Sequence, residues 1–385
     1  MNNTRLFVKR VAILALLFIY CVNNVFAESG LDIFQAVDDR VRVLECPSDE
    51  TLKKFAEDPK NSKIQHVIIH SGFRVSDVGL ESLAKMNIVS LSMDRAPSWS
   101  ARLGKEEMFS GVAFKKFTSL RYLGIAVDSF SDEGVAAIAQ IPTLETLVME
   151  DAGITQEQFA LLMTMKQLRS FTLHEQGFND EWITSQNLEN LSSLEVLDLE
   201  GGSIREGVFE AVSRLPNLKS LRLKTGLAPR TLFDIPFINP EIVDKITKEC
   251  SWNWAVVTRH MRNLEHLESL SLDGCIVAPE QWEFPPNFTR LKRLTIIDVN
   301  AAPLLSNSDK NSCSDALFLE AYEHIPNLEY LEGFISGEIL TKFLERNPTM
   351  ELGALAGREL GYVLSDAWDA AHDYEDAADG EGYAE

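Results

Sequence analysis

The residues best suited to chemistry are charged or titratable side chains that recur along the chain at steps of about 24 residues. They are Glu150, His174, Asp198, Glu200, Arg222, Lys224 and, further on, Asp273. An imidazole with carboxylates on either side could hold a divalent cation or act in general acid–base catalysis. His174 is the one imidazole in this set, so a site of that kind would centre on it.

The same residues could instead form a surface that binds a partner protein, with no catalytic or metal site. Exposed ion pairs contribute about 0–1 kcal/mol each, and alternating charge orients an incoming protein and speeds its association. The chain has no G-x-S-x-G, no H-E-x-x-H and no phosphate-binding glycine loop. We therefore expect a non-enzymatic protein that uses no metal or cofactor. A metal-dependent or hydrolytic enzyme with a site near His174 is the alternative.

The elements that position these residues follow from a repeat of leucines. The frame L-x-x-L-x-L, or a degenerate form of it, opens at Ile64, Ile88, Leu120, Leu144, Leu168, Leu194, Leu218, Leu267, Leu291 and Leu328. Five of the nine intervals between these openings are 24 residues long. Such a period is typical of stacked repeats, each of which contacts mainly its neighbours.

Each repeat is predicted to contain a short strand followed by a helix. Leu197 and Leu199, at positions 4 and 6 of their repeat, point to one side of a strand because side chains alternate. After a bend, apolar residues recur at three- and four-residue steps, as in a helix with one buried face. Ser131 and Thr155 stand where helix N-caps are expected, with acidic residues after them. Pro142 then ends a helix before the next strand.

Stacking such units predicts an α/β solenoid, a horseshoe of about ten repeats with parallel strands on the concave face and helices on the convex face. Helices are about 10 Å wide and neighbouring strands lie about 4.8 Å apart, so the stack must curve. The side chains at positions 5 and 7 of each repeat then point away from the core. At position 7, His174 is expected between Glu150 and Glu200. The two cations of the next strand, Arg222 and Lys224, are expected to face the carboxylates.

The frame resembles the leucine-rich repeat superfamily, and its helical outer half is similar to the cysteine-containing and ribonuclease-inhibitor-like repeats. The resemblance covers residues 61–345 and implies a scaffold that binds other proteins across its concave face. Where many relatives carry asparagine at position 9, this chain carries Ala152, Gly202 or Cys275. The asparagine ladder of those relatives is therefore expected to be missing, and Cys275 is expected to be a buried structural thiol.

Three repeats are too long, and their extra residues lie near 97–117, 225–266 and 300–320. Loops on a rigid scaffold commonly carry specificity, but these segments equally fit a role in covering the core. In the largest of them, Asn239-Pro240-Glu241 is typical of a helix start. Apolar residues at helical steps predict one long helix over residues 239–262, with Trp252 and Trp254 packed in the core.

The two ends of the chain differ from the repeats. Residues 1–27 have the pattern of a cleaved secretory signal peptide, with basic residues, a short apolar run and Val25-Phe26-Ala27 at the end. The apolar run is shorter than the roughly 20 residues that a membrane span needs. We expect residues 28–60 to cap the repeats and residues 346–385 to form a C-terminal cap and a disordered tail, since nine acids and no Lys or Arg follow position 358.

The net charge of the chain limits the kinds of partner it can bind. The formal net charge is −22, and cleavage after Ala27 takes it to −25 by removing three basic residues. This charge repels nucleic acid and anionic membranes. From the signal peptide we expect a protein that is secreted, periplasmic or at the cell surface, with no membrane span after cleavage. We also expect a monomer with a protein partner. A structural cell-surface role is a further alternative.

Four cysteines remain after cleavage, namely Cys46, Cys250, Cys275 and Cys313. They could form two disulfides in three alternative pairings.

Overall fold

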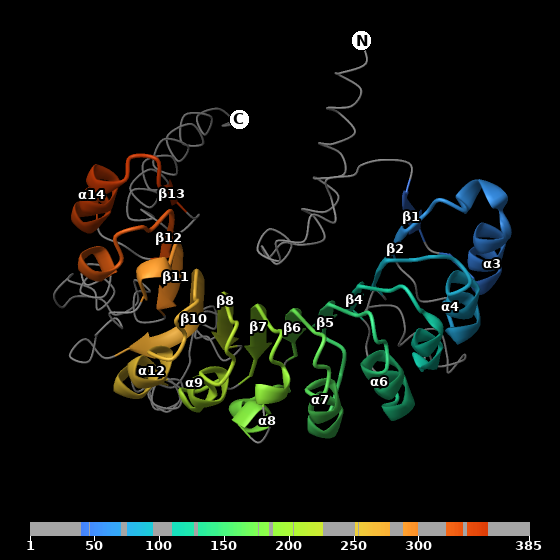
Figure 1. The fold of residues 1–385 in the computed structure, drawn as a ribbon, viewed down its shortest axis with the longest axis horizontal. Coiled ribbons are helices and arrows are strands. Elements are labelled where there is room, and N and C mark those ends of the chain that lie inside the picture. The colour runs from blue at the N-terminus through green and yellow to red at the C-terminus, as the bar shows by residue number, and fades with distance from the viewer. Residues whose placement is uncertain are drawn as a thin grey trace, which may run out of the picture. The chain divides into compact units, whose positions relative to one another are not determined.

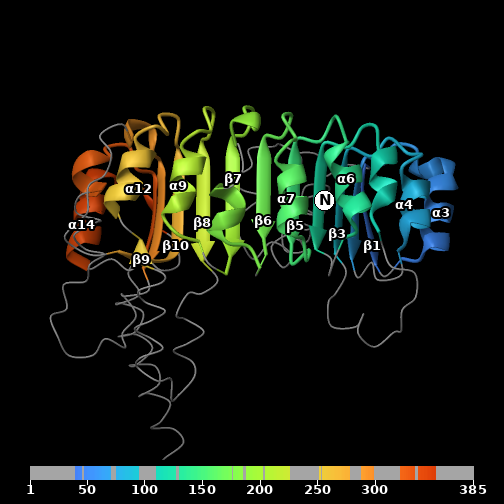
Figure 2. The same ribbon diagram turned by 90° about the horizontal axis from the view of Figure 1, so that it is seen from below.

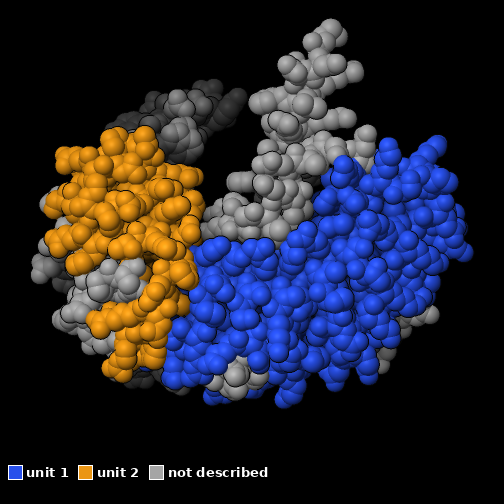
Figure 3. Space-filling view, viewed as in Figure 1, with its two compact units in different colours: residues 1–226 blue, residues 227–385 orange. Residues whose placement is uncertain are grey.

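Parallel strands and helices alternate along the chain (Figure 1). The structure is a computed structural model, and it describes residues 40–45, 47–70, 75–94, 110–126, 130–175, 177–184, 188–202, 204–225, 251–252, 254–277, 288–298, 321–333 and 337–352. The chain divides into two compact units, residues 1–226 (unit 1) and residues 227–385 (unit 2), coloured separately in Figure 3.

Within its described part, unit 1 contains eight parallel strands that follow one another in sequence order (Figure 2). They are β1 (Val41–Glu45), β2 (His66–His70), β3 (Ser90–Asp94), β4 (Tyr122–Ala126), β5 (Thr146–Glu150), β6 (Ser170–His174), β7 (Val196–Gly201) and β8 (Ser220–Thr225). Each strand pairs with the next at equivalent repeat positions. Glu150 therefore lies opposite His174, and His174 lies opposite Glu200.

The helices of unit 1 lie on one side of its sheet. Those among the described residues are α3 (Asp49–Glu57), α4 (Asp77–Leu83), α6 (Asp132–Ala139), α7 (Gln156–Leu162), α8 (Asp180–Thr184) and α9 (Gly207–Val212), with short 3-10 helices η2 (Pro59–Asn61), η3 (Val112–Lys116) and η4 (Leu188–Asn190). In Figure 1 the strands of this unit line the inner side of an arc and the helices line its outer side. The fold is an α/β leucine-rich repeat solenoid, which confirms the prediction from the sequence.

The leucine frame supplies the core between strands and helices. Leu197 and Leu199 are 2% and 0% exposed. The same two positions are buried in the neighbouring strands, at Leu123, Ile125, Leu147, Met149, Phe171, Leu173, Leu221 and Leu223. On the helix side, the ring of Phe159 packs against Phe178 and Trp182, with centroids 5.6 and 6.0 Å away. Burying a side chain of this kind contributes about 1.5–3 kcal/mol, and a repeat can bury it only against its neighbours.

Polar caps start the helices where the sequence predicts them. Ser131 accepts a hydrogen bond from the backbone N–H of Gly134 at 3.0 Å at the start of α6. Thr155 forms a capping box with Gln158 at the start of α7. A cap of this kind contributes about 1 kcal/mol, and it fixes where each helix leaves the bend that follows the strand.

Aspartates at the helix starts connect successive repeats, and we call these bonds the helix-start row. Asp49 of α3 accepts hydrogen bonds from the backbone N–H and the hydroxyl of Ser76 at 2.8 and 2.5 Å. Asp77 of α4 accepts from the backbone N–H and the hydroxyl of Ser110 at 3.1 and 2.7 Å. The carbonyl oxygen of Ser110 lies so close to Gly134 of α6 that a Cβ on this glycine would be 1.7 Å from it. The helix layer is thus tied together by polar contacts as well as apolar packing.

A second row of hydrogen bonds, the strand-start row, lies where the strands begin. Three side chains donate to backbone carbonyls 23–26 residues earlier in the chain, at 2.7–2.9 Å. The donors are Thr143, Gln167 and Asn217, and their acceptors are the carbonyls of Leu120, Ile141 and Ser192. These bonds link neighbouring repeats. They do not involve position 9, the position at which this chain has no asparagine.

Unit 2 has the same alternation of strand and helix. In it, β10 (Ser269–Val277), β11 (Arg293–Asp298), β12 (Tyr330–Gly333) and β13 (Glu351–Leu352) pair in parallel in this order, and β9 (Ser251–Trp252) pairs in parallel with the end of β10. Among its described helices are α12 (Trp254–Met261), η6 (Phe288–Arg290) and α14 (Gly337–Arg346). The leucine frame again fills the core, with Leu270, Leu272 and Leu294 fully buried.

The single long helix predicted over residues 239–262 is wrong near its middle. Residues 251–252 form β9, which pairs with β10, and α12 begins only at Trp254. Backbone groups that bond to a neighbouring strand cannot also continue a helix, because each residue has one N–H and one C=O. The predicted apolar face is present within α12, where Val257 and Met261 are buried.

Strands occur on both sides of the range 61–345 assigned to the repeats. β1 lies within residues 28–60 and pairs with β2, while β13 lies after residue 345 and pairs with β12. The described end of the first insertion packs in the core, since Phe114 and Phe117 are 0% and 2% exposed.

Several predictions concern parts that lie outside the described residues. These parts are the signal peptide, the start of the predicted long helix, most of the insertions, the acidic tail, the side chains of Trp252 and Trp254, and those of all four cysteines. Among the described helices, none combines the length and the apolar character that a membrane crossing needs.

Candidate functional site

The parallel register gathers six of the predicted residues on the strand face of unit 1, the face opposite its helices. They are Glu150, His174, Asp198, Glu200, Arg222 and Lys224, called here the charged cluster. Position 7 aligns four of them across β5 to β8, and position 5 aligns Asp198 with Arg222. The residues between them, such as Leu199, are in the core, so the cluster must point the other way.

Asp198 joins the cluster by bridging two neighbouring strands. Its Oδ1 lies 3.2 Å from Nε2 of His174 on β6, and its two oxygens accept from Nη1 of Arg222 on β8 at 3.1 and 3.0 Å. Asp198 is 4% exposed, and the side chains of His174 and Arg222 are 11% and 17% exposed. His174 lies in register between Glu150 and Glu200, as the sequence predicts. The sequence did not predict that its imidazole would bond to the buried Asp198, two residues before Glu200 on β7.

The carboxylate and the imidazole favour each other's charged form. Burial works to raise the pKa of Asp198, but the hydrogen bond from His174 and the charge of Arg222 outweigh it and lower that pKa. Burial works to lower the pKa of His174, but the hydrogen bond and charge of Asp198 outweigh it and raise that pKa. When it is protonated, the imidazole has no lone pair for a metal or a proton. Among the described residues, no group of three or more His, Cys, Asp or Glu side chains could hold a metal ion.

The two ends of the charged cluster are paired unequally. At one end, Nζ of Lys224 donates to Glu200 at 2.5 Å. At the other end, the nearest approach of Glu150 to His174 is 3.8 Å, beyond hydrogen-bonding distance, and the Glu150 side chain is 43% exposed. Burial raises the pKa of Glu150, His174 opposes this effect, and neighbouring carboxylates such as Asp151 add to it. Glu150 is therefore the most weakly paired carboxylate of the cluster.

Buried hydroxyls beside the cluster were not predicted. Thr146 of β5 and Ser170 and Thr172 of β6 are at most 2% exposed, and among the described residues their hydroxyl oxygens have no hydrogen-bond partner. Thr172 stands in register between Val148 and Asp198. A buried polar group left unsatisfied costs about 1–3 kcal/mol. Threonine and serine are ordinary strand residues, so no signal in the sequence marks these positions.

Asp273, the seventh residue predicted for this surface, lies on β10 of unit 2. It is 8% exposed and stands opposite Ile297 of β11. Unit 2 also has a polar cluster that the sequence did not predict. The hydroxyl of Tyr330 donates to Glu332 at 2.9 Å, and the guanidinium carbon of Arg293 lies 4.0 Å from the centre of the Tyr330 ring. These residues come from repeats separated by an insertion, where counting in steps of 24 fails.

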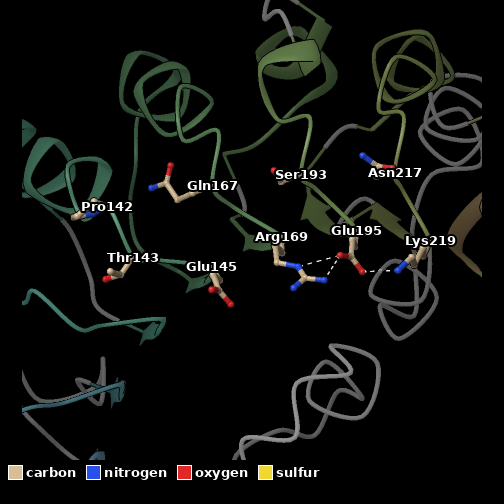
Figure 4. Close-up of a pocket in the computed structure, with 9 residues that line it drawn as sticks. All are labelled: Pro142, Thr143, Glu145, Gln167, Arg169, Ser193, Glu195, Asn217 and Lys219. Atoms are coloured by element: carbon tan, nitrogen blue, oxygen red, sulfur yellow. Dashed lines mark hydrogen bonds and ion pairs between the residues drawn. The ribbon is translucent and has the colours of Figure 1, made fainter.

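A groove of about 470 Å³ lies where β5 to β8 begin. Its lining consists of Pro142, Thr143, Glu145, Gln167, Arg169, Ser193, Glu195, Asn217 and Lys219. Figure 4 shows Arg169 and Lys219 turned toward Glu195, which lies between them. Both cations are thereby paired, and polar side chains of the strand-start row line the same groove. These contacts join repeats.

No protein-family model matches the chain, and no curated protein matches it. Among solved structures, an internalin from Listeria monocytogenes has 15% sequence identity, with 79% of this chain and 87% of that one covered and a TM-score of 0.37. The structure of the Rad7 and Elc1 complex from yeast matches at 16% identity, with 79% of this chain and 77% of that one covered and a TM-score of 0.42. These likenesses are distant, and the fold is assigned from the strand register and leucine core of this chain.

Proposed function

We propose that the protein is a non-enzymatic scaffold that recognises another protein through the strand face of unit 1. The observation that carries the proposal is the bridge of Asp198 to His174 and Arg222, which fixes charged side chains from three consecutive repeats. Side chains that are already held in place lose little freedom when a partner binds. Their alternating charges favour one orientation of the partner.

The environment of His174 supports recognition over catalysis. Its Nε2 is engaged by Asp198, and its Nδ1 faces Glu150 at 3.8 Å. A general base must instead keep a lone pair free toward a substrate. The enzyme near His174, which was the alternative from the sequence, therefore has less support than the scaffold. We also propose that the protein is exported, because residues 1–27 have the composition of a secretory signal.

A charge swap on the strand face tests the proposal. The variant Glu150→Lys/Lys224→Glu reverses the charge at both ends of the cluster and leaves the net charge unchanged. The matched control, Glu57→Lys/Lys85→Glu, makes the same swap at two exposed residues of the helix layer. Each protein serves as bait in an extract of the compartment where the wild type resides, and mass spectrometry identifies the proteins retained. Thermal unfolding verifies that all three baits are folded.

We expect a partner that the wild type and the control retain and that the swapped variant loses. Reversed end charges misalign the partner, while the equal net charge removes any general effect of the acidic chain. Three identical sets of retained proteins would contradict recognition through this face.

A further inference from the structure

Glu150 is the carboxylate of the charged cluster with the weakest pairing. The Asp198 carboxylate accepts hydrogen bonds from His174 and Arg222, and the Glu200 carboxylate accepts one from Lys224. Glu150 has one ionic contact among the described residues, the 3.8 Å approach to Nδ1 of His174. Its carboxylate is nevertheless half accessible at the edge of the cluster, so it can accept hydrogen bonds from outside the chain.

The surroundings of Glu150 add negative charge. Asp151 follows it in a left-handed conformation with φ of 47°, and its backbone N–H donates to the carbonyl of His174 at 2.8 Å. Its side chain is exposed. Glu175 lies next to His174 in the chain, and its carboxylate accepts from the backbone N–H of Gly153 at 2.7 Å. Three carboxylates therefore stand where β5 and β6 end, in a chain whose net charge is −22.

An unsatisfied acceptor lies on the same face. Thr172 is two residues before His174 on β6, so their side chains share a face, and Val148 opposite Thr172 is two residues before Glu150. Among the described residues, the Thr172 hydroxyl oxygen has no hydrogen-bond partner although the residue is 0% exposed. Because the residue is closed to solvent, a donor from a partner could reach this oxygen only after the side chains over it move, and the bond would then remove the cost of leaving it unpaired.

We infer that the Glu150 end of the charged cluster binds an arginine side chain of the partner protein. This inference rests on the proposed recognition through the strand face. A guanidinium presents five N–H donors in a planar fork, so it can bond to the Glu150 carboxylate and still donate to a second acceptor. The negative field of the chain attracts a basic segment. An acidic segment would be repelled by Glu150, Asp151 and Glu175.

A defined peptide tests the inference without knowledge of the natural partner. The probe is a blocked peptide in which glycine and arginine alternate three times, and its counterpart carries neutral citrulline in place of arginine. Binding to the full chain is measured by calorimetry in about 0.1 M salt, where charges more than about 10 Å apart are largely screened. The variants are Glu150→Gln and, as the control with the same loss of charge, Glu57→Gln on the helix side.

We expect the arginine peptide to bind the wild type in a saturable way and the citrulline peptide to bind at least fivefold more weakly. Glu150→Gln is expected to weaken binding of the arginine peptide about fivefold, and Glu57→Gln less than twofold. The inference is overturned if the wild type shows no saturable binding, or if Glu150→Gln weakens binding no more than Glu57→Gln does. That second result, together with a partner lost in the charge swap, would remove the arginine site and leave recognition through the strand face in place.

Discussion

Asp198 occupies a position where a lone carboxylate would be unstable. Removing a charge from water costs several kcal/mol unless partners and hydrogen bonds compensate. Here His174 and Arg222 supply both, from the strands on either side. Thr172, next to Asp198 in the register, has no such compensation among the described residues. Whether a buried polar group is hydrogen-bonded therefore decides its effect on stability, and this can be measured on hydroxyl groups.

Two threonine-to-valine substitutions separate these effects. Thr172→Val removes an unsatisfied hydroxyl, so we expect the free energy of unfolding to rise by about 1 kcal/mol. Thr143→Val removes a hydroxyl that donates to the carbonyl of Leu120 at 2.7 Å, so we expect a decrease of about 1 kcal/mol. Urea unfolding measures both changes. A decrease in both variants would mean that the hydroxyl of Thr172 is satisfied.

At the scale of elements, the contact between α6 and the preceding repeat depends on a glycine. In an ordinary helix, replacing glycine by alanine stabilises by about 1 kcal/mol. At Gly134 the added Cβ would lie 1.7 Å from the carbonyl oxygen of Ser110, which also accepts a hydrogen bond from the hydroxyl of Ser131 at 3.2 Å.

We therefore expect Gly134→Ala to lower the free energy of unfolding by about 1–3 kcal/mol, against the helix preference. Gly177→Ala is the control, because its Cβ would meet only the end of the Glu175 side chain at 4.0 Å. That substitution is expected to change stability by less than about 0.5 kcal/mol. Thermal unfolding of the two variants compares them directly, and equal effects would show that the close approach of α6 to Ser110 is not a constraint.

Elements with a local signal could be predicted from the sequence, and elements that depend on a distant partner could not. The caps at Ser131 and Thr155 are local, because each side chain bonds to a backbone N–H three residues on. β9 exists because residues 251–252 pair with a strand some 25 residues later in the chain. Their own side chains are compatible with a helix, so the helical periodicity was extended through them in error.

The sequence predicted which site residues lie side by side on neighbouring strands. It did not predict which of their side chains form hydrogen bonds. Counting repeat positions placed Glu150, His174 and Glu200 on neighbouring strands, as observed. The approach of His174 to Asp198 is diagonal, and it depends on side-chain conformations and on burial that the spacing of residues does not encode. For the same reason, the weak pairing of Glu150 could not be seen before the structure.

At the scale of the whole molecule, the account depends on parallel register being kept through successive repeats of unit 1. Residues 24 apart in sequence then become neighbours in space, and β6, β7 and β8 together hold one buried ionic network. If the register slipped by one residue, the charged side chains would enter the core. The central claim is therefore that His174 and Asp198 form a direct pair across β6 and β7.

An NMR titration of the His174 imidazole tests this claim most directly, with the signal assigned by comparison with His174→Gln. In the wild type, we expect the pKa of His174 to lie above its ordinary value of about 6.5, because the hydrogen bond and charge of Asp198 outweigh burial. In Asp198→Asn, we expect the pKa of His174 to fall, since burial and the charge of Arg222 then act without opposition from Asp198. A pKa of His174 that stays at its ordinary value in both proteins would contradict the account.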